Sequence, residues 1–156
     1  MHEIILLRHA ETHAPDTHGN DRDRALTTRG EEEARQAGAW LAARGAAPDG
    51  VLVSTARRAM MTAERATAAL PPAAVTRHED AVYEATPGEL LRLIDDCGAN
   101  QLLLVGHNPG IEQLVALLVS GQSGDFRGMP PAGLAWIRVD GDLEPGSGTL
   151  EAFWSP

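Results

Sequence analysis

The amino-acid sequence predicts a three-layer α/β/α sandwich with a mostly parallel central sheet. Short apolar runs alternate along the 156-residue chain with longer segments whose apolar residues recur at helical spacing. The resulting order, β-α-β-α-β-α-β-α-β-β, is typical of α/β proteins in which helices cover a sheet. No repeat or linker interrupts this order, so we expect a single domain over residues 1–156.

The strands are predicted by short apolar runs, of the kind found in strands that are buried on both faces. In chain order these runs are Glu3–Leu7, Val51–Val53, Val75–His78, Leu102–Val105, Leu134–Val139 and Thr149–Phe153. The last two flank a turn built on Gly141 and on the cluster Pro145–Gly148. The stretches Ala10–Ala25 and Gly121–Gly133 lack periodicity, and we expect them to be irregular loops. Long loops in a compact domain are usually functional or disordered.

The helices are predicted from capping residues and from apolar spacing. In chain order we expect helices from Thr28 to Gly45, from Ala56 to Leu70, from Thr86 to Cys97, and from Asn108-Pro109 to about Val119. Capping boxes open the first helix at Thr28–Glu31 and the third at Thr86–Glu89. Ser54 and Thr55 are candidate N-caps of the second helix, and Pro71-Pro72 ends it because proline cannot continue the hydrogen-bond ladder.

Composition excludes several classes of function. The formal net charge is −9, and all 13 basic residues are arginine. Without lysine the chain has no Walker P-loop and no Schiff-base chemistry. An acidic chain also lacks the basic face that binds nucleic acids and anionic membranes. We therefore expect no nucleic-acid partner and no membrane partner.

Cysteine usage and hydropathy indicate where the protein acts. The single cysteine, Cys97, excludes an internal disulfide and a cysteine-based zinc cluster. The N-terminal segment lacks the basic region of a signal peptide. No apolar stretch approaches the roughly 20 residues that span a bilayer. We expect a soluble, cytoplasmic protein.

Polar residues suited to phosphoryl chemistry follow three of the predicted strands. Arg8-His9 ends the first, Ser54 with Arg57-Arg58 follows the second, and Gly106-His107 ends the fourth. Ligands of α/β sheets bind outside the carboxyl ends of the strands, so these residues are expected to share one crevice. Arginine binds phosphate oxygens bidentately, and neutral histidine is a nucleophile for phosphorus. The amides at the start of the helix after Asn108 add a further anion site.

Each of these residues also has a purely structural interpretation. His9 alone fits a surface loop, and Arg58 alone fits a solvated helix terminus. His107 fits a buried structural histidine, and Glu84 fits an ordinary surface carboxylate. The structural interpretations weaken together, because the strand-end candidates all fall at predicted carboxyl ends.

Four motifs in chain order resemble those of the histidine phosphatase superfamily, the phosphoglycerate mutase-like enzymes. They are Leu7–Thr12, Leu26–Gly30, Ser54–Thr62 and Val105–Asn108. The short chain, the stretch Leu104–Gly110 and the segment Gly146–Leu150 look most like the SixA-type phosphohistidine phosphatase branch. The resemblance runs from Ile4 to about Phe153. One departure is Ala10, which stands where the family usually has glycine.

The resemblance implies a phosphatase that needs no cofactor and no metal. His9 would be the phosphorylated nucleophile, and Arg8, Arg58 and His107 would bind the phosphoryl oxygens. Arg58 is preferred to Arg57 because it directly precedes Ala59, as in the motif. We also expect Asn108 to contact the substrate.

A proton donor is implied at Glu84, in the pattern Val82-Tyr83-Glu84, with Tyr83 as its competitor. A phosphoramidate would depend less on that acid than an ester, since a protonated imidazole leaves readily. The few residues left for a lid favour a phosphorylated protein, with phosphohistidine as the substrate group. A small phosphorylated metabolite, such as a sugar phosphate or nucleotide, stays open as the alternative.

Two other classes of protein compete with a phosphatase. A metal site would use His9, His13 and His18 with acidic neighbours Glu11, Asp16 and Asp21. Their spacing matches no standard zinc motif. The second competitor is a non-catalytic phosphate-binding module, although such a module has no need of a nucleophilic histidine.

Overall fold

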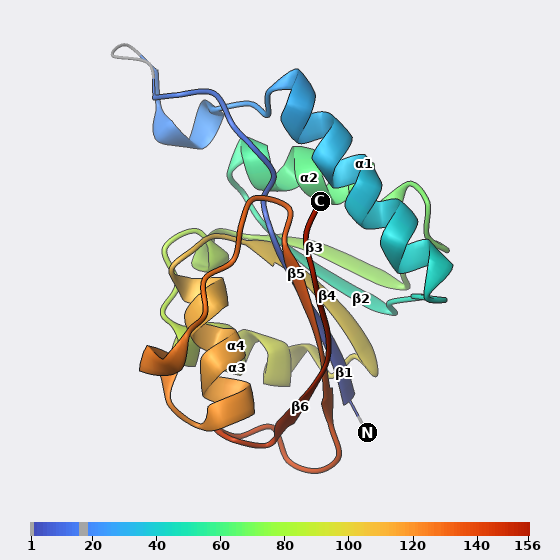
Figure 1. Cartoon of the computed structure of the whole chain (residues 1–156), viewed down its shortest axis with the longest axis vertical. Helices are drawn as coiled ribbons and strands as arrows, with labels where there is room; N and C mark the ends of the chain where they lie inside the picture. The colour runs from blue at the N-terminus through green and yellow to red at the C-terminus, as the bar shows by residue number, and fades with distance from the viewer. Residues whose placement is uncertain (1, 16–18) are drawn as a thin grey trace.

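The computed structural model describes residues 2–15 and 19–156. Its centre is a six-stranded sheet with the order β3-β2-β4-β1-β5-β6 (Figure 1). The strands are β1 (His2–Arg8), β2 (Gly50–Ser54), β3 (Val75–Glu79), β4 (Gln101–Gly106), β5 (Leu134–Val139) and β6 (Gly148–Trp154). The helices are α1 (Thr28–Ala43), α2 (Arg57–Thr67), α3 (Pro87–Cys97) and α4 (Gly110–Ser120), with 3-10 turns η1 (Asp21–Asp23), η2 (Asp80–Val82) and η3 (Ser123–Asp125). The predicted fold class is confirmed.

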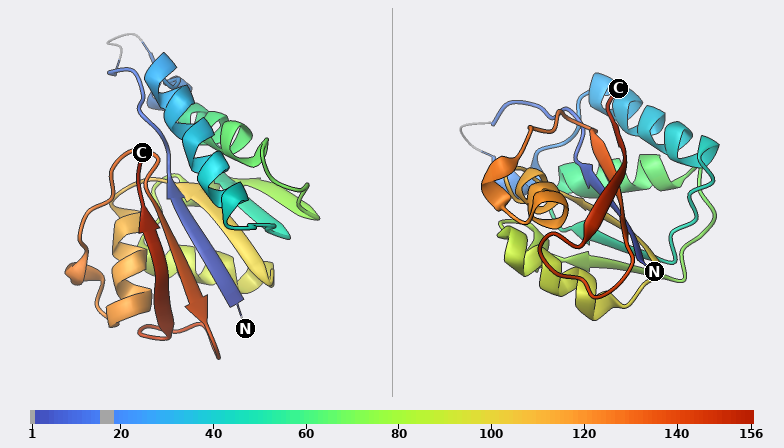
Figure 2. Two further views of the ribbon diagram at one scale, coloured as in Figure 1. Left: turned by 45° about the vertical axis from the view of Figure 1, so that its right-hand side comes forward. Right: turned by 60° about the horizontal axis from the view of Figure 1, so that its bottom comes forward.

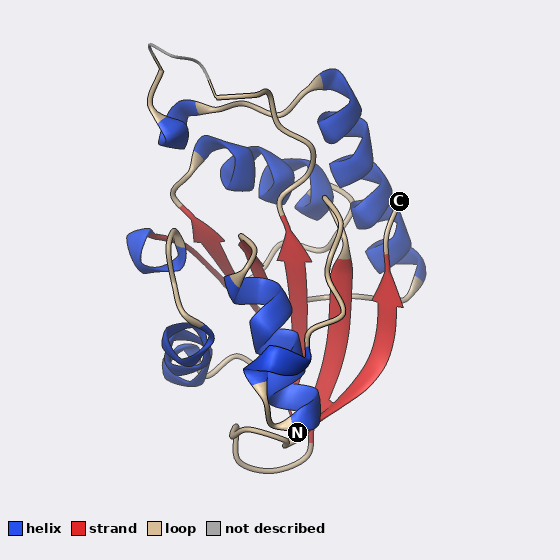
Figure 3. Ribbon diagram, turned by 60° about the vertical axis from the view of Figure 1, so that its left-hand side comes forward, coloured by secondary structure: helices blue, strands red, loops and turns tan. Residues whose placement is uncertain are grey.

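The sheet is parallel in its central part and antiparallel at one side. β1 pairs in parallel with β4, β4 with β2, and β2 with β3. β5 runs antiparallel to both β1 and β6. Arg8 pairs with Gly106, so β1 and β4 end at the same level. Figure 3 shows the arrowheads of the parallel strands pointing to one edge of the sheet. The polar strand-end residues line a cleft at that edge.

Helices cover both faces of the sheet. α1 and α2 lie on one face and α3 and α4 on the other (Figure 2). Alternate residues of β1 pack into the two hydrophobic cores, one on each face of the sheet. Ile4 and Leu6 belong to the cluster that includes α3 and α4, whereas Ile5 and Leu7 belong to the cluster that includes α1 and α2. All four side chains are at most 1% exposed, which explains why the strand lacks polar alternation.

The N-cap of the first helix lies one residue earlier than predicted. Thr27, not Thr28, is the N-cap, and its hydroxyl accepts a hydrogen bond from the Gly30 amide at 2.9 Å. The Thr27 amide is bonded to the Glu11 carbonyl at 3.1 Å, which holds Thr27 extended. The capping box predicted at Thr28–Glu31 was therefore wrong, because a contact with the preceding loop selects the cap. The helix ends at Ala43, before the predicted Gly45.

The second helix has no side-chain cap. It begins at Arg57 after Ala56, so the prediction that Ser54 or Thr55 caps it was wrong. Ser54 accepts from the Ala56 amide at 3.2 Å but lies within 2.7 Å of His107. Thr55 donates to Asp80 at 2.6 Å. Both hydroxyls thus form hydrogen bonds with residues that are distant in sequence. A prediction from the local sequence cannot include these partners.

The capping box of the third helix is confirmed. Thr86 accepts from the Glu89 amide at 3.2 Å, and the Glu89 carboxylate accepts from the Thr86 amide at 3.4 Å. Pro87 occupies the first turn, where its missing N–H costs nothing. The fourth helix begins at Gly110 with Pro109 as its N-cap, slightly later than predicted.

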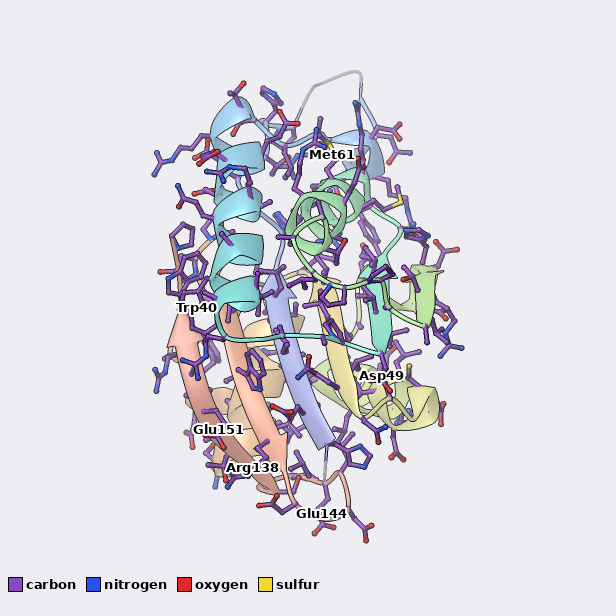
Figure 4. All side chains as sticks on the ribbon, turned by 90° about the vertical axis from the view of Figure 1, so that its right-hand side faces the viewer. Trp40, Asp49, Met61, Arg138, Glu144 and Glu151 are labelled. Carbon is purple, nitrogen blue, oxygen red and sulfur yellow. The ribbon has the colours of Figure 1, made fainter. Side chains whose placement is uncertain are left out.

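Helices α1 and α2 pack closely through a glycine. A Cβ added at Gly38 would lie 2.3 Å from the carbonyl oxygen of Ala66, so only glycine fits at this crossing. Figure 4 shows this face of the molecule, with Trp40 on α1 and Met61 on α2.

The sheet edge opposite the strand-end residues is stabilised by Asp49, which lies at the start of β2 in Figure 4. Its carboxylate accepts from the Gln101 and Asn100 amides at 2.8 and 3.1 Å. These hydrogen bonds tie the entry of β2 to the entry of β4. In residues 2–15 and 19–156, no helix is both long and apolar enough to cross a membrane.

Candidate active site

The carboxyl ends of the parallel strands open into a cleft of about 340 Å³. It is lined by Arg8, His9, Thr12, Asp21, Arg24, Arg58, Tyr83, Glu84, His107 and Asn108. All six site residues expected from the sequence therefore lie around one cavity. The residues that line the cleft lie at or just after the ends of β1, β2 and β4 or in the loops after residues 9 and 79. This is the expected position of a ligand site in a parallel sheet.

His9 lies at the floor of the cleft directly after β1, and only 9% of its surface is exposed. Its Nδ1 lies 2.8 Å from the Ala10 carbonyl oxygen. A carbonyl only accepts, so Nδ1 carries the proton and donates it, which leaves the lone pair on Nε2. Burial above all, and then the positive charges of Arg58 and Arg8, lower the pKa of His9 to about 4. His9 is therefore neutral at pH 7, as a nucleophile requires.

Ala10 is accommodated in place of glycine. It is fully buried, and its amide donates to the Thr62 hydroxyl at 3.0 Å. In the described part of the chain Ala132 is the one non-glycine residue with positive φ, at 57°. Ala10 therefore avoids the backbone conformation that favours glycine.

His107 follows β4 and lies opposite His9, with ring centroids 5.2 Å apart. Its Nε2 is 2.7 Å from the Ser54 hydroxyl oxygen, which fixes the orientation of the ring. Burial above all, together with the neighbouring His9 and Arg58, lowers the pKa of His107 to about 3. In the ligand-free cleft His107 is thus a neutral group. A phosphoryl dianion beside it would favour the charged form instead.

Arg58 lies in the first turn of α2 and is 7% exposed. Its guanidinium faces the cleft, where Nη1 donates to the Asp21 carbonyl at 2.7 Å and Nη2 to the Asp21 carboxylate at 3.0 Å. Arg57 is exposed and lines a different cavity, between α2 and strands β2 and β3. The structure thus places Arg58, not Arg57, beside the two histidines.

Arg8 and Asn108 are held by the same backbone carbonyl. Arg8 Nη1 donates to Met129 O at 2.8 Å, and Asn108 Nδ2 donates to it at 2.9 Å. Met129 belongs to the irregular stretch before β5, so that loop positions two cleft residues. Burial lowers the pKa of Arg8, although arginine stays cationic at neutral pH.

Tyr83 and Glu84, the two proposed proton donors, both line the cleft. The Tyr83 hydroxyl donates to the Asp21 carboxylate, and this hydrogen bond raises the pKa of Tyr83. Its ring meets the His107 ring edge-on, with centroids 5.5 Å apart. The tyrosine proton is thus already engaged by Asp21, and the assignment of Glu84 as proton donor, with Tyr83 as its competitor, stays a prediction.

Three groups at the cleft are not expected from the sequence as parts of a phosphoryl site. Asp21 is predicted only as an alternative metal ligand, and Arg24 and the Met129 carbonyl are not predicted at all. Ser54 is expected at the crevice because it follows β2 just before Arg58, but its contact with His107 is not. The segment around Asp21 gives no local signal, because it reaches the cleft only when the long loop folds back.

The structure brings together no metal site in the part that it describes. Among residues 2–15 and 19–156, no three His, Cys, Asp or Glu side chains are grouped as metal ligands. His18 and Asp16, which belonged to the alternative metal hypothesis, lie outside the described residues. Nδ1 of His9 is bonded to a backbone carbonyl, and Asp21 is bonded to arginines.

The sheet order, the helical layers and the cleft at the strand ends define a phosphoglycerate mutase-like α/β protein. A family model described as the histidine phosphatase superfamily (branch 1) matches residues 4–92. The chain belongs to this superfamily, and its structure resembles SixA proteins along nearly its whole length. Membership of the superfamily supports phosphatase activity.

Three known proteins illustrate the likeness. The uncharacterized protein Rv1276c of Mycobacterium tuberculosis is 37% identical over 162 residues, which cover 96% of this chain and 99% of that protein. A structure from Agrobacterium tumefaciens, provisionally assigned as the phosphohistidine phosphatase SixA, is 28% identical with a TM-score of 0.86, covering 99% and 98% of the two chains. The protein histidine phosphatase SixA complexed with tungstate is 25% identical with a TM-score of 0.83, covering 98% and 96%.

Proposed function

We propose that this protein removes phosphate from phosphohistidine in a protein partner, through a phosphorylated His9. One observation carries the proposal: the buried, neutral His9 presents an unprotonated Nε2 in a cleft lined by three arginines and a second histidine. A neutral nucleophile surrounded by permanently charged arginines is suited to attack on phosphorus.

The reaction has two displacements. The lone pair of His9 Nε2 forms a bond to phosphorus while the bond from phosphorus to the substrate nitrogen breaks. The electron pair of that bond stays on the leaving imidazole. Arg8 and Arg58 neutralise the phosphoryl oxygens, with His107 and Asn108 as further hydrogen-bond donors. Water then attacks phosphorus, the bond to His9 Nε2 breaks, and phosphate is released.

The choice of substrate is supported by likeness and by access. The resemblance to SixA proteins covers nearly the whole chain. The Asp21 side chain on the rim is 47% exposed, so the mouth of the cleft is open to solvent. An exposed phosphorylated side chain of another protein could enter such a mouth.

A phosphatase for a small metabolite is the second candidate. The cleft volume of about 340 Å³ falls at the lower end of the range of roughly 300–1,000 Å³ that small-molecule sites occupy. Sugar phosphates and nucleotides belong to this class.

Labelling with an aryl phosphate tests the nucleophile. We expect an acid-labile, base-stable phosphoryl group on His9 and its loss in His9→Ala. His13→Ala, which removes an exposed histidine of the following loop, is the matched control and should keep the label. Full hydrolysis by His9→Ala would refute the mechanism. Binding of phosphate without turnover would support the non-catalytic alternative.

A substrate panel tests the specificity. We expect a higher kcat/KM for a phosphohistidine protein than for sugar phosphates or nucleotides, and the reverse order would favour the metabolite phosphatase. Activity should survive exhaustive treatment with EDTA. Its loss would revive the metal hypothesis.

A further inference from the structure

Asp21 occupies a position on the cleft that the phosphoryl chemistry described above does not use. Its Oδ1 accepts from Arg24 Nη1 at 3.0 Å. Its Oδ2 accepts from Arg58 Nη2 at 3.0 Å and from the Tyr83 hydroxyl. A carboxylate offers about four acceptor sites, so these three donors leave one for a further hydrogen bond. With 47% of the side chain exposed, that site can be reached from the mouth of the cleft.

The position of Asp21 is fixed by its neighbours on the rim. The next residue, Arg22, donates to the Thr55 hydroxyl at 2.6 Å and to the Asp80 carboxylate at 3.1 Å. The Arg22 guanidinium also lies 4.2 Å from the centre of the Tyr83 ring. The η1 turn is thereby attached to the ends of β2 and β3, and it holds the Asp21 carboxylate above the phosphoryl-binding floor.

The protonation state of Asp21 limits what it can do. The hydrogen bond from Tyr83 and then those from Arg24 and Arg58 hold its pKa well below the usual range. Asp21 is therefore an anion at neutral pH, which accepts hydrogen bonds and cannot give a proton to a leaving alkoxide. A group that leaves while keeping its own N–H is the natural complement of such a carboxylate.

We propose that Asp21, with Tyr83 and Arg24 holding it, is the leaving-group subsite for the imidazole ring of phosphohistidine. This inference rests on the proposed function. The carboxylate accepts a hydrogen bond from the distal ring N–H of the protonated substrate ring. When the phosphorus–nitrogen bond breaks, its electron pair stays on the ring nitrogen and neutral imidazole departs, so no proton has to be supplied. An ester oxygen gains nothing from the same anion and is repelled by it.

Two aspartates of the same turn provide the test. Asp21→Asn removes the carboxylate with little change of shape, and Asp23→Asn removes an equal charge from a residue that does not line the cleft. The measurement is kcat/KM for phosphoimidazole and for p-nitrophenyl phosphate, with both variants checked by circular dichroism. We expect Asp21→Asn to lower the ratio of the two values about tenfold or more, because a hydrogen bond to a charged group is lost. Asp23→Asn should keep the ratio within twofold.

The other outcomes overturn the inference. An equal loss of kcat/KM on both substrates would show that Asp21 only positions Arg58. An equal gain in kcat/KM on both substrates would show that the Asp21 carboxylate only occupies the place that the phosphoryl group takes. If Asp21→Asn does not fold, Asp21→Ser, which keeps an acceptor without the charge, decides between the same outcomes. Failure of the unsubstituted protein on phosphoimidazole, despite a label on His9, would instead remove phosphohistidine as the substrate.

Discussion

The rings of His9 and His107 face each other across the cleft with centroids 5.2 Å apart and an interplanar angle of 56°. A positive charge on either ring is unfavourable, because both rings are buried and because Arg58 and Arg8 oppose it. This arrangement keeps the nucleophile unprotonated. It also makes the stability of the fold depend on pH, which the sequence alone does not reveal.

We predict that the folded protein loses stability as the pH falls from 7 to 5. The folded-state pKa values of His9 and His107 are about 4 and about 3, below the unfolded value near 6.5. Between these values the unfolded chain binds more protons, so the free energy of unfolding decreases as the pH drops. The loss is roughly 1–2 kcal/mol for each histidine at pH 5. Urea unfolding at both pH values measures it.

The control for this prediction removes one titrating group at a time. His9→Gln and His107→Gln should each flatten the decline between pH 7 and pH 5, while His13→Gln should not. A decline of the same slope in all three variants would contradict the assignment of the acid sensitivity to the two cleft histidines.

Arg58 and Arg57 are adjacent in sequence but line different cavities. Arg58→Ala should lower kcat/KM about 100-fold or more, because a buried cation that binds the phosphoryl group is lost. Arg57→Ala should stay within twofold, since Arg57 lies outside the cleft. Steady-state kinetics with an aryl phosphate distinguish the two. A larger effect at Arg57 would reverse the assignment.

Glu84 should matter for esters and much less for phosphoramidates. Glu84→Gln is expected to lower kcat/KM for an alkyl phosphate by roughly 10²–10⁴, the usual contribution of a general acid. The loss on phosphoimidazole should be far smaller, because its leaving group departs with its own proton. Tyr83→Phe serves as the comparison. If Tyr83→Phe shows the ester-selective loss and Glu84→Gln does not, Tyr83 is the donor.

The crossing of α1 and α2 should not tolerate a methyl group. Gly38→Ala is expected to destabilise the fold by roughly 1–3 kcal/mol, because the new Cβ overlaps the Ala66 carbonyl. Gly88→Ala, in the first turn of α3 with open space around it, should instead stabilise by about 0.5–1 kcal/mol. Midpoints of urea unfolding compare the two, and equal shifts in one direction would contradict the close packing.

The sequence was informative wherever the signal was local. The strand–helix order follows from periodicity, and the Thr86–Glu89 capping box depends on residues three positions apart. The strand-end positions of His9, Arg58 and His107 follow from where each apolar run stops. Because parallel strands end at one edge of the sheet, their convergence in one cleft could be anticipated as well.

Contacts between distant residues were decided by the tertiary structure alone. Thr27 replaces Thr28 as the cap because its amide meets Glu11, and Ser54 orients His107 from 53 positions away. Asp21 reaches Arg58 and Tyr83 across 37 and 62 positions. Such contacts form only after the sheet has brought its loops together, so no local spacing encodes them. The sequence by itself determined the fold class and the residues suited to phosphoryl transfer, and the folded chain decided which groups hold them in place.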